Sequence, residues 1–438
     1  PNACESIIYS ENFSSTDKSV DFKIDINKKL NRYDMPVAEV VPHYLTESDA
    51  KRVATVLFGD VIGYEKQPFL AQRFSKDEIK AKLTRWSQFA SSNALTSLYG
   101  QSNDAALATI KEFIEYYTCE YEIAPNYNIN MPCQWEFKDE AYYTYAPEDV
   151  KKMGLLDNKA IMATYNKGDV AYSYAVVTRT TTDYKLNMIS VHLFGGTSPM
   201  DIDERIFRAE LCRTSAPTEE QIDSICSNAK KMLDEMELGE WDISQYKVIN
   251  TFYGDTPEYT VHINATPTFH GVSAAQQPEL YNLNNDTAYA SNYYMTNATF
   301  DFSVDGTLID FEMVSPIDIQ DIINDNVATM DISALIDRAK TQLIHTDYHS
   351  YGIKNLERVA NEELIYHVEI TDLSLKLLRT RIPNTDDAYY YSPGIILEGF
   401  EECLGKESGN VYYASSEPRI YVAINAVDGT VVPLENNS

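Results

Sequence analysis

The second half of the chain contains the same pattern twice, and this repeat constrains the fold more than any other feature. A helix is predicted to begin after Thr218 and another after Asp331, and strand-rich sequence follows each of them. Both strand-rich stretches end in Val-Asp-Gly-Thr, at 304–307 and at 427–430. Because the two markers recur in the same order, they indicate two copies of a helix-plus-sheet unit.

Both predicted helices carry apolar residues at helical spacing, which predicts one buried face on each. Thr-Glu-Glu-Gln at 218–221 is typical of the capping box that begins a helix. The apolar positions are Ile222, Ile225, Cys226, Ala229, Leu233 and Met236 in the first helix, and Ile332, Leu335, Ile336, Ala339 and Leu343 in the second.

Each Val-Asp-Gly-Thr predicts a β-hairpin, since Asp-Gly favours the two-residue type I′ turn. With Val304 opposite Thr307, the predicted register pairs Phe302 with Ile309 and Phe300 with Phe311 on a covered face, and leaves Asp301, Asp310 and Ser303 on an acidic face. The strand of the second copy is predicted to be buried on both sides, with Ile420, Val422, Ile424 and Val431 on one face and Tyr421, Val432 and Leu434 on the other.

The first half is predicted to combine strands with helices. Residues 20–26 alternate apolar and polar side chains, which indicates a half-buried strand. Helices are predicted to begin at the capping patterns 46–49 and 75–78, with a third helix over 106–117. Further strands are predicted over 169–182 and 185–194.

With 438 residues, the chain is longer than one hydrophobic core usually serves. We expect an α+β fold of antiparallel sheets, each covered by helices on one face, with a tandem repeat in the C-terminal half. The expected divisions are a flexible tail over 1–17, an N-terminal α+β domain with a helical insertion over 18–210, and helix-plus-sheet repeats over 211–316 and 317–438.

Acidic residues outnumber basic ones, with 66 Asp and Glu against 36 Lys and Arg, for a net charge of −30. Such a charge repels phosphate backbones and anionic membrane surfaces, so nucleic acid is not an expected partner. The 32 tyrosines are expected mainly on half-exposed strands, with a sugar-binding or peptide-binding surface as the alternative.

The sequence predicts an exported protein. It has no apolar run of about 18 residues, the length that a membrane-spanning helix requires. Because the sequence given starts at Pro1 and not at Met, we expect that a leader or an anchor was removed.

The 6 cysteines include no Cys-x-x-Cys pair, so neither a zinc site nor a dense disulfide framework is predicted. Most are expected to be core thiols, and disulfide formation stays an open question for Cys119, Cys133, Cys212, Cys226 and Cys403.

Two pairs of histidines are candidates for a functional role. His345 and His349 lie four apart at the end of the second repeat helix, a spacing that suits a metal ion. The Glu of a metalloprotease motif is missing, and a His near a helix C-terminus interacts favourably with the helix dipole, so we favour a structural role and leave metal binding open. His262 and His270 lie in or beside a strand and are interpreted as ordinary polar positions.

Three polar segments could bind a ligand, and each is interpreted as a solvated loop or turn. Two could offer oxygen ligands to Ca²⁺ but do not match its spaced binding loop. They are Asp318, Asp321 and Asp325, in a stretch typical of a linker between the repeats, and the cluster Asn284, Asn285 and Asp286. The third, Phe-Gly-Gly-Thr-Ser at 194–198, could form an anion-binding nest.

No pattern in the sequence combines a nucleophile with a base, so we assign no catalytic, cofactor-binding or metal-binding residue and expect no enzymatic activity.

Two segments, "EVVPHYLTESDAKRVATVLFGDVIGYE" at 39–65 and "YVAINAVDGTVVPL" at 421–434, resemble a domain-of-unknown-function family of lipid-anchored exported proteins from gut Clostridia-type bacteria. The resemblance spans most of the chain and implies export and lipid anchoring to the outer face of the cytoplasmic membrane. The duplicated unit is also similar, at the level of the fold alone, to PepSY-type and YycH/YycI-type extracytoplasmic modules, which bind or inhibit partners.

Two functions therefore stay open. The first is a non-catalytic binding or regulatory lipoprotein that engages a protein, a peptide or a cell-wall component through an acidic, Tyr-rich face. The second is a hydrolase that acts on glycan or peptide through paired carboxylates, which a pocket with two close carboxylates would favour. A protein that captures substrate for a transporter is a further variant of the first.

Overall fold

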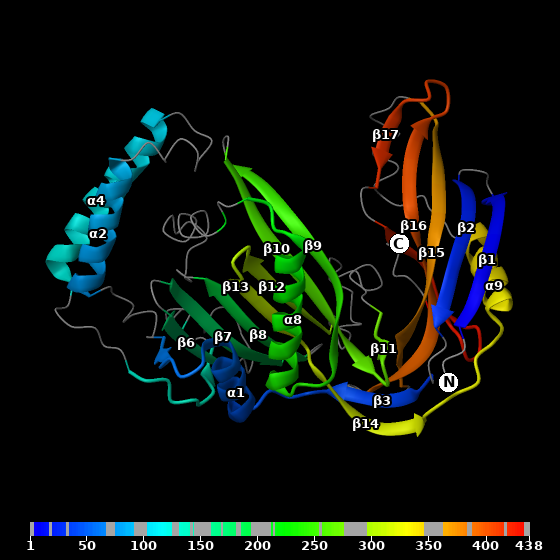
Figure 1. The fold of residues 1–438 in the computed structure, drawn as a ribbon, viewed down its shortest axis with the longest axis horizontal. Coiled ribbons are helices and arrows are strands. Elements are labelled where there is room, and N and C mark those ends of the chain that lie inside the picture. Colours follow the sequence, from blue (N-terminus) through cyan, green and yellow to red (C-terminus); the bar gives the residue numbers. More distant parts are fainter. Residues whose placement is uncertain are drawn as a thin grey trace.

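The structure is a computed structural model, and it consists of two β-sheets joined by a short pair of strands (Figure 1). It describes residues 4–16, 20–31, 35–66, 75–91, 103–124, 131–140, 143, 159–167, 170–180, 185–193, 212, 215–253, 256–275, 296–345, 362–382, 388–415 and 418–432. Helices and mainly antiparallel sheets occur together, which confirms the expected α+β class.

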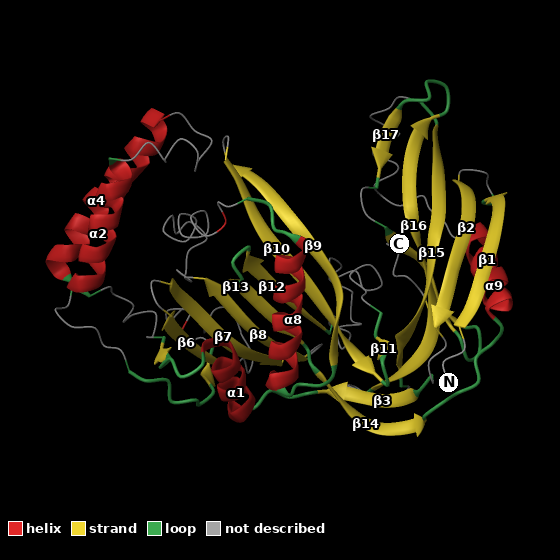
Figure 2. Cartoon of the chain, in the orientation of Figure 1, coloured by secondary structure: helices red, strands yellow, loops and turns green. Residues whose placement is uncertain are grey.

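Sheet A contains nine of the described strands, in the order β1-β2-β15-β16-β18-β19, with β3 and β17 paired to β16 and β14 paired to β3. Figure 2 shows β1, β2, β15 and β16 side by side in this sheet. Within it β2 and β15 run parallel, whereas the other pairs are antiparallel. The strands are β1 (Cys4–Ser14), β2 (Val20–Asn31), β3 (Val37–Pro42), β14 (Ile317–Asn324), β15 (Leu364–Arg381), β16 (Tyr389–Gly405), β17 (Val411–Ala414), β18 (Arg419–Asn425) and β19 (Val431–Val432).

The expectation of a flexible tail is wrong for Cys4–Ser14, which forms β1. This strand pairs with β2 along its whole length, from Cys4 opposite Asn31 to Ser14 opposite Asp21. The ring of Phe13 stacks on that of Phe22, with 5.1 Å between the ring centroids. Ile7 is buried in the same hydrophobic cluster as Phe22, so the strand contributes to the core.

Sheet B contains ten of the described strands, in the order β11-β10-β12-β13-β8-β7-β6-β4, with β9 paired to β10 and β5 paired to β6. The strands are β4 (Tyr64–Glu65), β5 (Lys138–Asp139), β6 (Lys159–Lys167), β7 (Val170–Thr180), β8 (Lys185–Leu193), β9 (Trp241–Tyr253), β10 (Thr256–Phe269), β11 (Val272–Ser273), β12 (Asn297–Ser303) and β13 (Leu308–Val314).

The predicted division at 210 runs through sheet B and does not separate two cores. Strand β13 of the first repeat pairs with β8 of the preceding segment, where Phe311 lies opposite Val191. One hydrophobic cluster contains both residues. The expected N-terminal domain over 18–210 is also divided, because β2 and β3 lie in sheet A and β4 to β8 in sheet B.

Three of the described helices bury an apolar face. The buried faces of α1 (Glu47–Phe58) and α8 (Glu219–Met236) share a hydrophobic cluster with strands of sheet B, and that of α9 (Ile332–His345) shares one with sheet A. Of the residues predicted for the face of α8, Ile222 lies outside this cluster and Cys226 is only partly buried against it. Capping boxes begin α1 at Thr46 and α8 at Thr218, as predicted. Helices α2 (Lys76–Ala90) and α4 (Asn103–Ile123) pack on each other, where the rings of Trp86 and Phe113 stack at 5.2 Å.

The first Val-Asp-Gly-Thr forms a hairpin, but its register differs in part from the prediction. Phe300 faces Phe311 and Asp301 faces Asp310, as expected, whereas Phe302 faces Leu308 and not Ile309. The reason is the turn: the amide of Ser303 donates to the carbonyl of Thr307, so the loop has three residues, and only its last one, Gly306, has a positive φ (+83°). A type I turn closed by a glycine bulge therefore replaces the predicted type I′ turn and shifts the pairing.

The second Val-Asp-Gly-Thr closes β18 and β19 with one more residue in the loop. The amide of Asn425 donates to the carbonyl of Thr430, and Gly429 supplies the positive φ. In both loops the Asp side chain accepts a hydrogen bond from the backbone amide of the Thr two positions on, at 3.1 Å from Thr307 to Asp305 and 2.8 Å from Thr430 to Asp428.

Strand β18 is buried on both sides, as predicted, but a bulge changes the assignment of faces. Val422 and Ile424 lie in the cluster with α9, and Val431 packs against it. Ile420 packs instead with Val432 around a separate cluster, because the pairing with β16 shifts at that point. Leu434 lies outside the described residues.

The strands that follow α8 and those that follow α9 have a similar order. After α8 the neighbours are β9-β10-β12-β13, and after α9 they are β15-β16-β18-β19. In both, a short strand that follows the second long strand pairs back onto it, β11 onto β10 and β17 onto β16.

The two sheets meet at β3 and β14, which cross between them at the bottom of Figure 1. A hydrophobic cluster at this junction joins Val40 of β3, Phe269 of β10 and Tyr389 of β16.

None of the helices that the structure describes is long and apolar enough to span a membrane. Cys119, Cys133 and Cys226 are free thiols, and Cys212 and Cys403 are buried.

Candidate functional site

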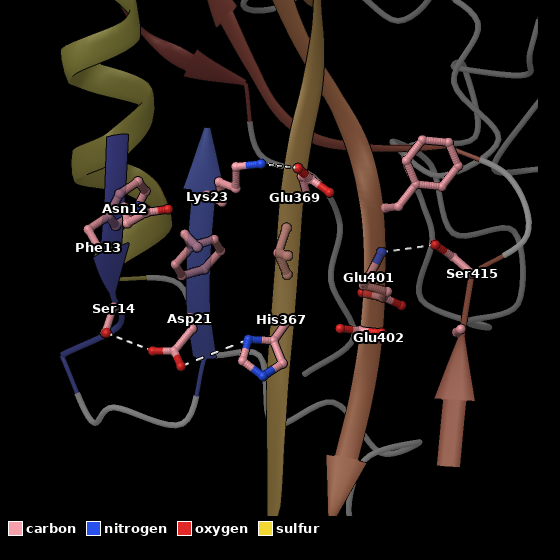
Figure 3. Close-up of a pocket in the computed structure, with 14 residues that line it drawn as sticks. Asn12, Phe13, Ser14, Asp21, Lys23, His367, Glu369, Glu401, Glu402 and Ser415 are labelled. Atoms are coloured by element: carbon pink, nitrogen blue, oxygen red, sulfur yellow. Dashed lines mark hydrogen bonds and ion pairs between the residues drawn. The ribbon is translucent and has the colours of Figure 1, made fainter. Parts of the chain in front are cut away.

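A groove of about 840 Å³ lies on sheet A, over β1, β2, β15 and β16 and beside the end of β17 (Figure 3). Strand pairing brings its side chains together from opposite ends of the sequence, because β2 pairs with β15. Its lining contains four carboxylates, one lysine and one histidine. The lining residues are Asn12, Phe13, Ser14, Asp21, Phe22, Lys23, His367, Val368, Glu369, Phe400, Glu401, Glu402, Ala414 and Ser415.

Two rows of side chains cross the groove, because residues opposite each other on neighbouring strands share a face. In one row Ser14, Asp21, His367 and Glu402 are successive cross-strand partners. In the other row Asn12, Lys23, Glu369 and Phe400 are partners in the same way. Phe22 and Val368 alternate with these residues along their strands and are buried with α9, so the two rows lie on the face away from that helix.

Ion pairs fix part of the groove. The Lys23 ammonium lies 2.5 Å from a Glu369 oxygen and 3.3 Å from an Asp25 oxygen. The hydrogen bond to Glu369 and then that to Asp25 raise the pKa of Lys23 above its ordinary value. The Ser14 hydroxyl donates to Asp21 at 2.7 Å, and Asp21 lies 3.9 Å from the His367 ring.

Glu402 and Phe400 are available to a ligand, whereas the Glu401 carboxylate is paired with Arg419 at 2.8 Å. The side chain of Glu402 is exposed and makes no ion pair or hydrogen bond within the described residues. Its neighbour Phe400 is 38% exposed, which is high for an aromatic side chain in the middle of a sheet. A carboxylate beside an exposed ring suits a cation, since the ring face attracts positive charge as well.

The groove does not have the arrangement of a serine hydrolase. Asp21 lies between Ser14 and His367, so the Ser14 proton is directed to a carboxylate and not to the imidazole. Glu402 lies in water, whereas a glycosidase general acid is held in apolar surroundings that keep it protonated.

A second polar row crosses sheet B, and only its central pair, Asp301 and Asp310, was predicted from the sequence. His262, Asp301, Asp310 and His192 are successive cross-strand partners on β10, β12, β13 and β8. His262 Nδ1 lies 2.8 Å from Asp301, and His192 Nδ1 lies 3.1 Å from Asp310. The hydrogen bond to Asp301 raises the pKa of His262. Nothing in the sequence places the two histidines beside this pair, because they come from two further strands, β10 and β8.

The other sequence candidates are dispersed. His345 lies in the last turn of α9, as expected, with its Nδ1 3.4 Å from the Thr16 hydroxyl. His270 has a φ of +50°, precedes Gly271 in the tight turn between β10 and β11, and stacks on Phe269. His349, the cluster 284–286 and the segment 194–198 lie outside the described residues.

The interpretation of 318–325 as a linker is wrong for most of its length, because Ile317–Asn324 forms strand β14. Asp318 hydrogen-bonds to His43 at 2.9 Å, and the other ring nitrogen of His43 lies 3.2 Å from Asp49 at the start of α1. Across the described ranges, no three His, Cys, Asp or Glu side chains are grouped so that they could hold a metal ion.

Comparisons of the chain with known protein families, with curated proteins and with solved structures find no match.

Proposed function

We propose that this protein is a non-catalytic extracytoplasmic binding lipoprotein, and that the groove on sheet A holds a cationic segment of a peptide or of a basic wall-associated protein. The observation that carries the proposal is the exposed pair Glu402 and Phe400, set among further carboxylates in a groove of about 840 Å³. A net charge of −30 steers cationic partners toward the molecule. Export and lipid anchoring rest on the resemblance of 39–65 and 421–434 to exported lipoproteins.

A second argument for a binding role is that the groove lies on the face of sheet A away from α9. We infer that 218–315 and 331–434 are tandem copies of one helix-plus-sheet unit, because their strands follow the same order and each ends in a loop with the same Asp-to-amide hydrogen bond. In this proposal helices cover one face of each sheet, and the opposite face of sheet A presents the groove.

The test measures binding of a labelled oligolysine peptide by fluorescence anisotropy. Glu402→Lys should weaken binding roughly tenfold, because it replaces an attraction by a repulsion. Phe400→Ala should weaken it roughly threefold, the loss expected for one exposed cation–π contact. Glu122→Lys is the matched control, because Glu122 is exposed on α4, far from sheet A (Figure 1). This control changes the net charge by the same amount and should alter binding less than about twofold.

Equal losses in Glu402→Lys and Glu122→Lys would contradict the proposal, because they would reduce binding to an effect of net charge. Binding through the groove should also fall as salt rises to about 0.5 M. The alternative function, a carboxylate-dependent hydrolase, would be supported by turnover of a glycan or peptide substrate that Glu402→Gln or Asp21→Asn abolishes.

A further inference from the structure

Strand β14 is an unusually apolar and exposed edge. Within the part of the chain that the structure describes, it pairs with β3 alone. Of its 8 residues only Ile317 is buried. Ile319, Ile322 and Ile323 are 38%, 44% and 51% exposed, so one strand contributes three large exposed aliphatic side chains. A clustered set of this kind marks an interaction surface more often than single exposed residues do.

Two of these isoleucines continue a buried layer. Ile319 lies opposite Val40, and Ile322 lies opposite Ala38. Val40 and Ala38 are fully buried in the cluster at the junction of the two sheets. Because cross-strand partners share a face, Ile319 and Ile322 extend that apolar layer past β3 to the open edge. One more strand beside β14 would cover them.

The charge of this edge selects the kind of strand that fits. Asp318 and Asp321 lie on β14, Glu39 lies opposite Asp321 on β3, and Asp325 follows β14. Neither strand contains a Lys or an Arg. If two copies of the chain paired through β14, these acidic residues would face each other, and like charges on paired strands are destabilising. A basic strand would instead gain attraction from the same residues.

Two irregularities limit the length of the partner. The pairing of β14 with β3 shifts between Ile319 and Asp321 and again between Ile322 and Asn324. Bulges and charges at an edge are devices that discourage uncontrolled pairing. Here the charges are acidic, so they disfavour an acidic strand and favour a short basic one over a neutral one.

We propose that β14 is a second docking site, which takes an extended segment of alternating aliphatic and basic residues from another protein as an added strand of sheet A. The main-chain hydrogen bonds would come from the open edge of β14, the apolar side chains would cover Ile319 and Ile322, and the basic side chains would meet Asp321 and its acidic neighbours. This site is separate from the groove and does not depend on the function proposed for it.

The probe is a labelled peptide of alternating valine and lysine with the length of β14, 8 residues. Two further peptides carry N-methyl groups on the valine amides or on the lysine amides, so that each has lost the donors of one strand edge. Added-strand binding uses one edge of the peptide, so one methylated peptide should bind like the parent and the other roughly tenfold more weakly. In hydrogen exchange, the parent peptide should slow exchange at Ile317–Asn324.

Protein variants locate the site. The double variant Ile319→Ser with Ile322→Ser should weaken the parent peptide roughly tenfold, and Asp321→Lys should weaken it roughly fivefold. Glu122→Lys, on α4 and outside both proposed sites, should leave its affinity within about twofold. Equal binding of both methylated peptides, or no change in exchange at β14, would overturn the proposal. The proposal would also be overturned if the protein alone formed a dimer and the double serine variant were monomeric, because the occupant of β14 would then be a second copy.

Discussion

At the scale of single residues, the first hairpin is stabilised by buried phenylalanines, and its register is set by the glycine in its loop. Phe300, Phe302 and Phe311 are fully buried, and the rings of Phe300 and Phe302 stack at 5.6 Å. The position of Gly306 determines which residue faces which, because it is the residue of the loop that adopts a positive φ.

Replacing Phe302 by alanine should cost about 3–5 kcal/mol of unfolding free energy, since it leaves a cavity among fully buried neighbours. Urea denaturation measures the change. Phe400→Ala is the matched control, because that ring is 38% exposed and its loss should cost below about 1 kcal/mol. Similar losses in the two variants would refute the assignment of Phe302 to the core.

His262 predicts a pH dependence of stability with a definite sign. Its pKa is raised in the folded protein by the hydrogen bond to Asp301, despite the opposing effect of burial. The protonated ring therefore stabilises the fold below the unfolded pKa of about 6.5, and this contribution is lost as the pH rises through the folded pKa. Denaturation curves at several pH values should show the loss in the native protein and not in His262→Gln. An identical pH slope in both proteins would contradict the prediction.

At the scale of elements, local patterns predicted the helices well because their signals are contiguous. Thr46 and Thr218 each accept the amide three residues on, as the capping pattern requires, and Leu335, Ile336 and Ala339 form the buried face expected for α9. The strands 169–182 and 185–194 correspond to β7 and β8.

Partners of strands that are far apart in the sequence could not be predicted, and the groove depends on them. Asp21 and His367 become neighbours because β2 pairs in parallel with β15, and nothing near either residue in the sequence indicates that pairing. For the same reason, the positions of His262 and His192 beside the hairpin were not predicted. The stretch Ile317–Asn324 is typical of a linker in sequence because half of its residues are polar. It nevertheless forms a strand, in which only Ile317 is buried.

Strand β1 gives a prediction at this scale. Its 11 residues pair with β2, so the amides that point toward β2 should exchange with solvent slowly, while those on the open edge exchange faster. Hydrogen exchange resolved by residue would show this alternation over Cys4–Ser14. Uniformly fast exchange, as in an unstructured peptide, would contradict the assignment of β1 to sheet A.

At the scale of the whole molecule, the net charge of −30 opposes the compact state, because folding brings like charges together. The thermal unfolding midpoint should therefore rise as salt screens this repulsion, up to about 0.3 M. Sodium chloride and potassium chloride should have the same effect at equal ionic strength. A midpoint that stays constant or falls would mean that attractive ion pairs, such as Lys23 with Glu369, outweigh the repulsion.

The parallel pairing of β2 with β15 has a consequence for the order in which the protein is made. Lys23 and Glu369 touch across 346 residues of chain, so sheet A cannot be completed until almost the whole polypeptide has been synthesised. The strands β4 to β13 of sheet B all lie between these two points and are available earlier. During synthesis, β1 and β2 can therefore pair only with each other, and the apolar side chains of Phe22 and Ile24 stay exposed to solvent. Exposed apolar side chains promote aggregation, so the N-terminal strands of the nascent chain are at risk of aggregation for longer than the strands of sheet B.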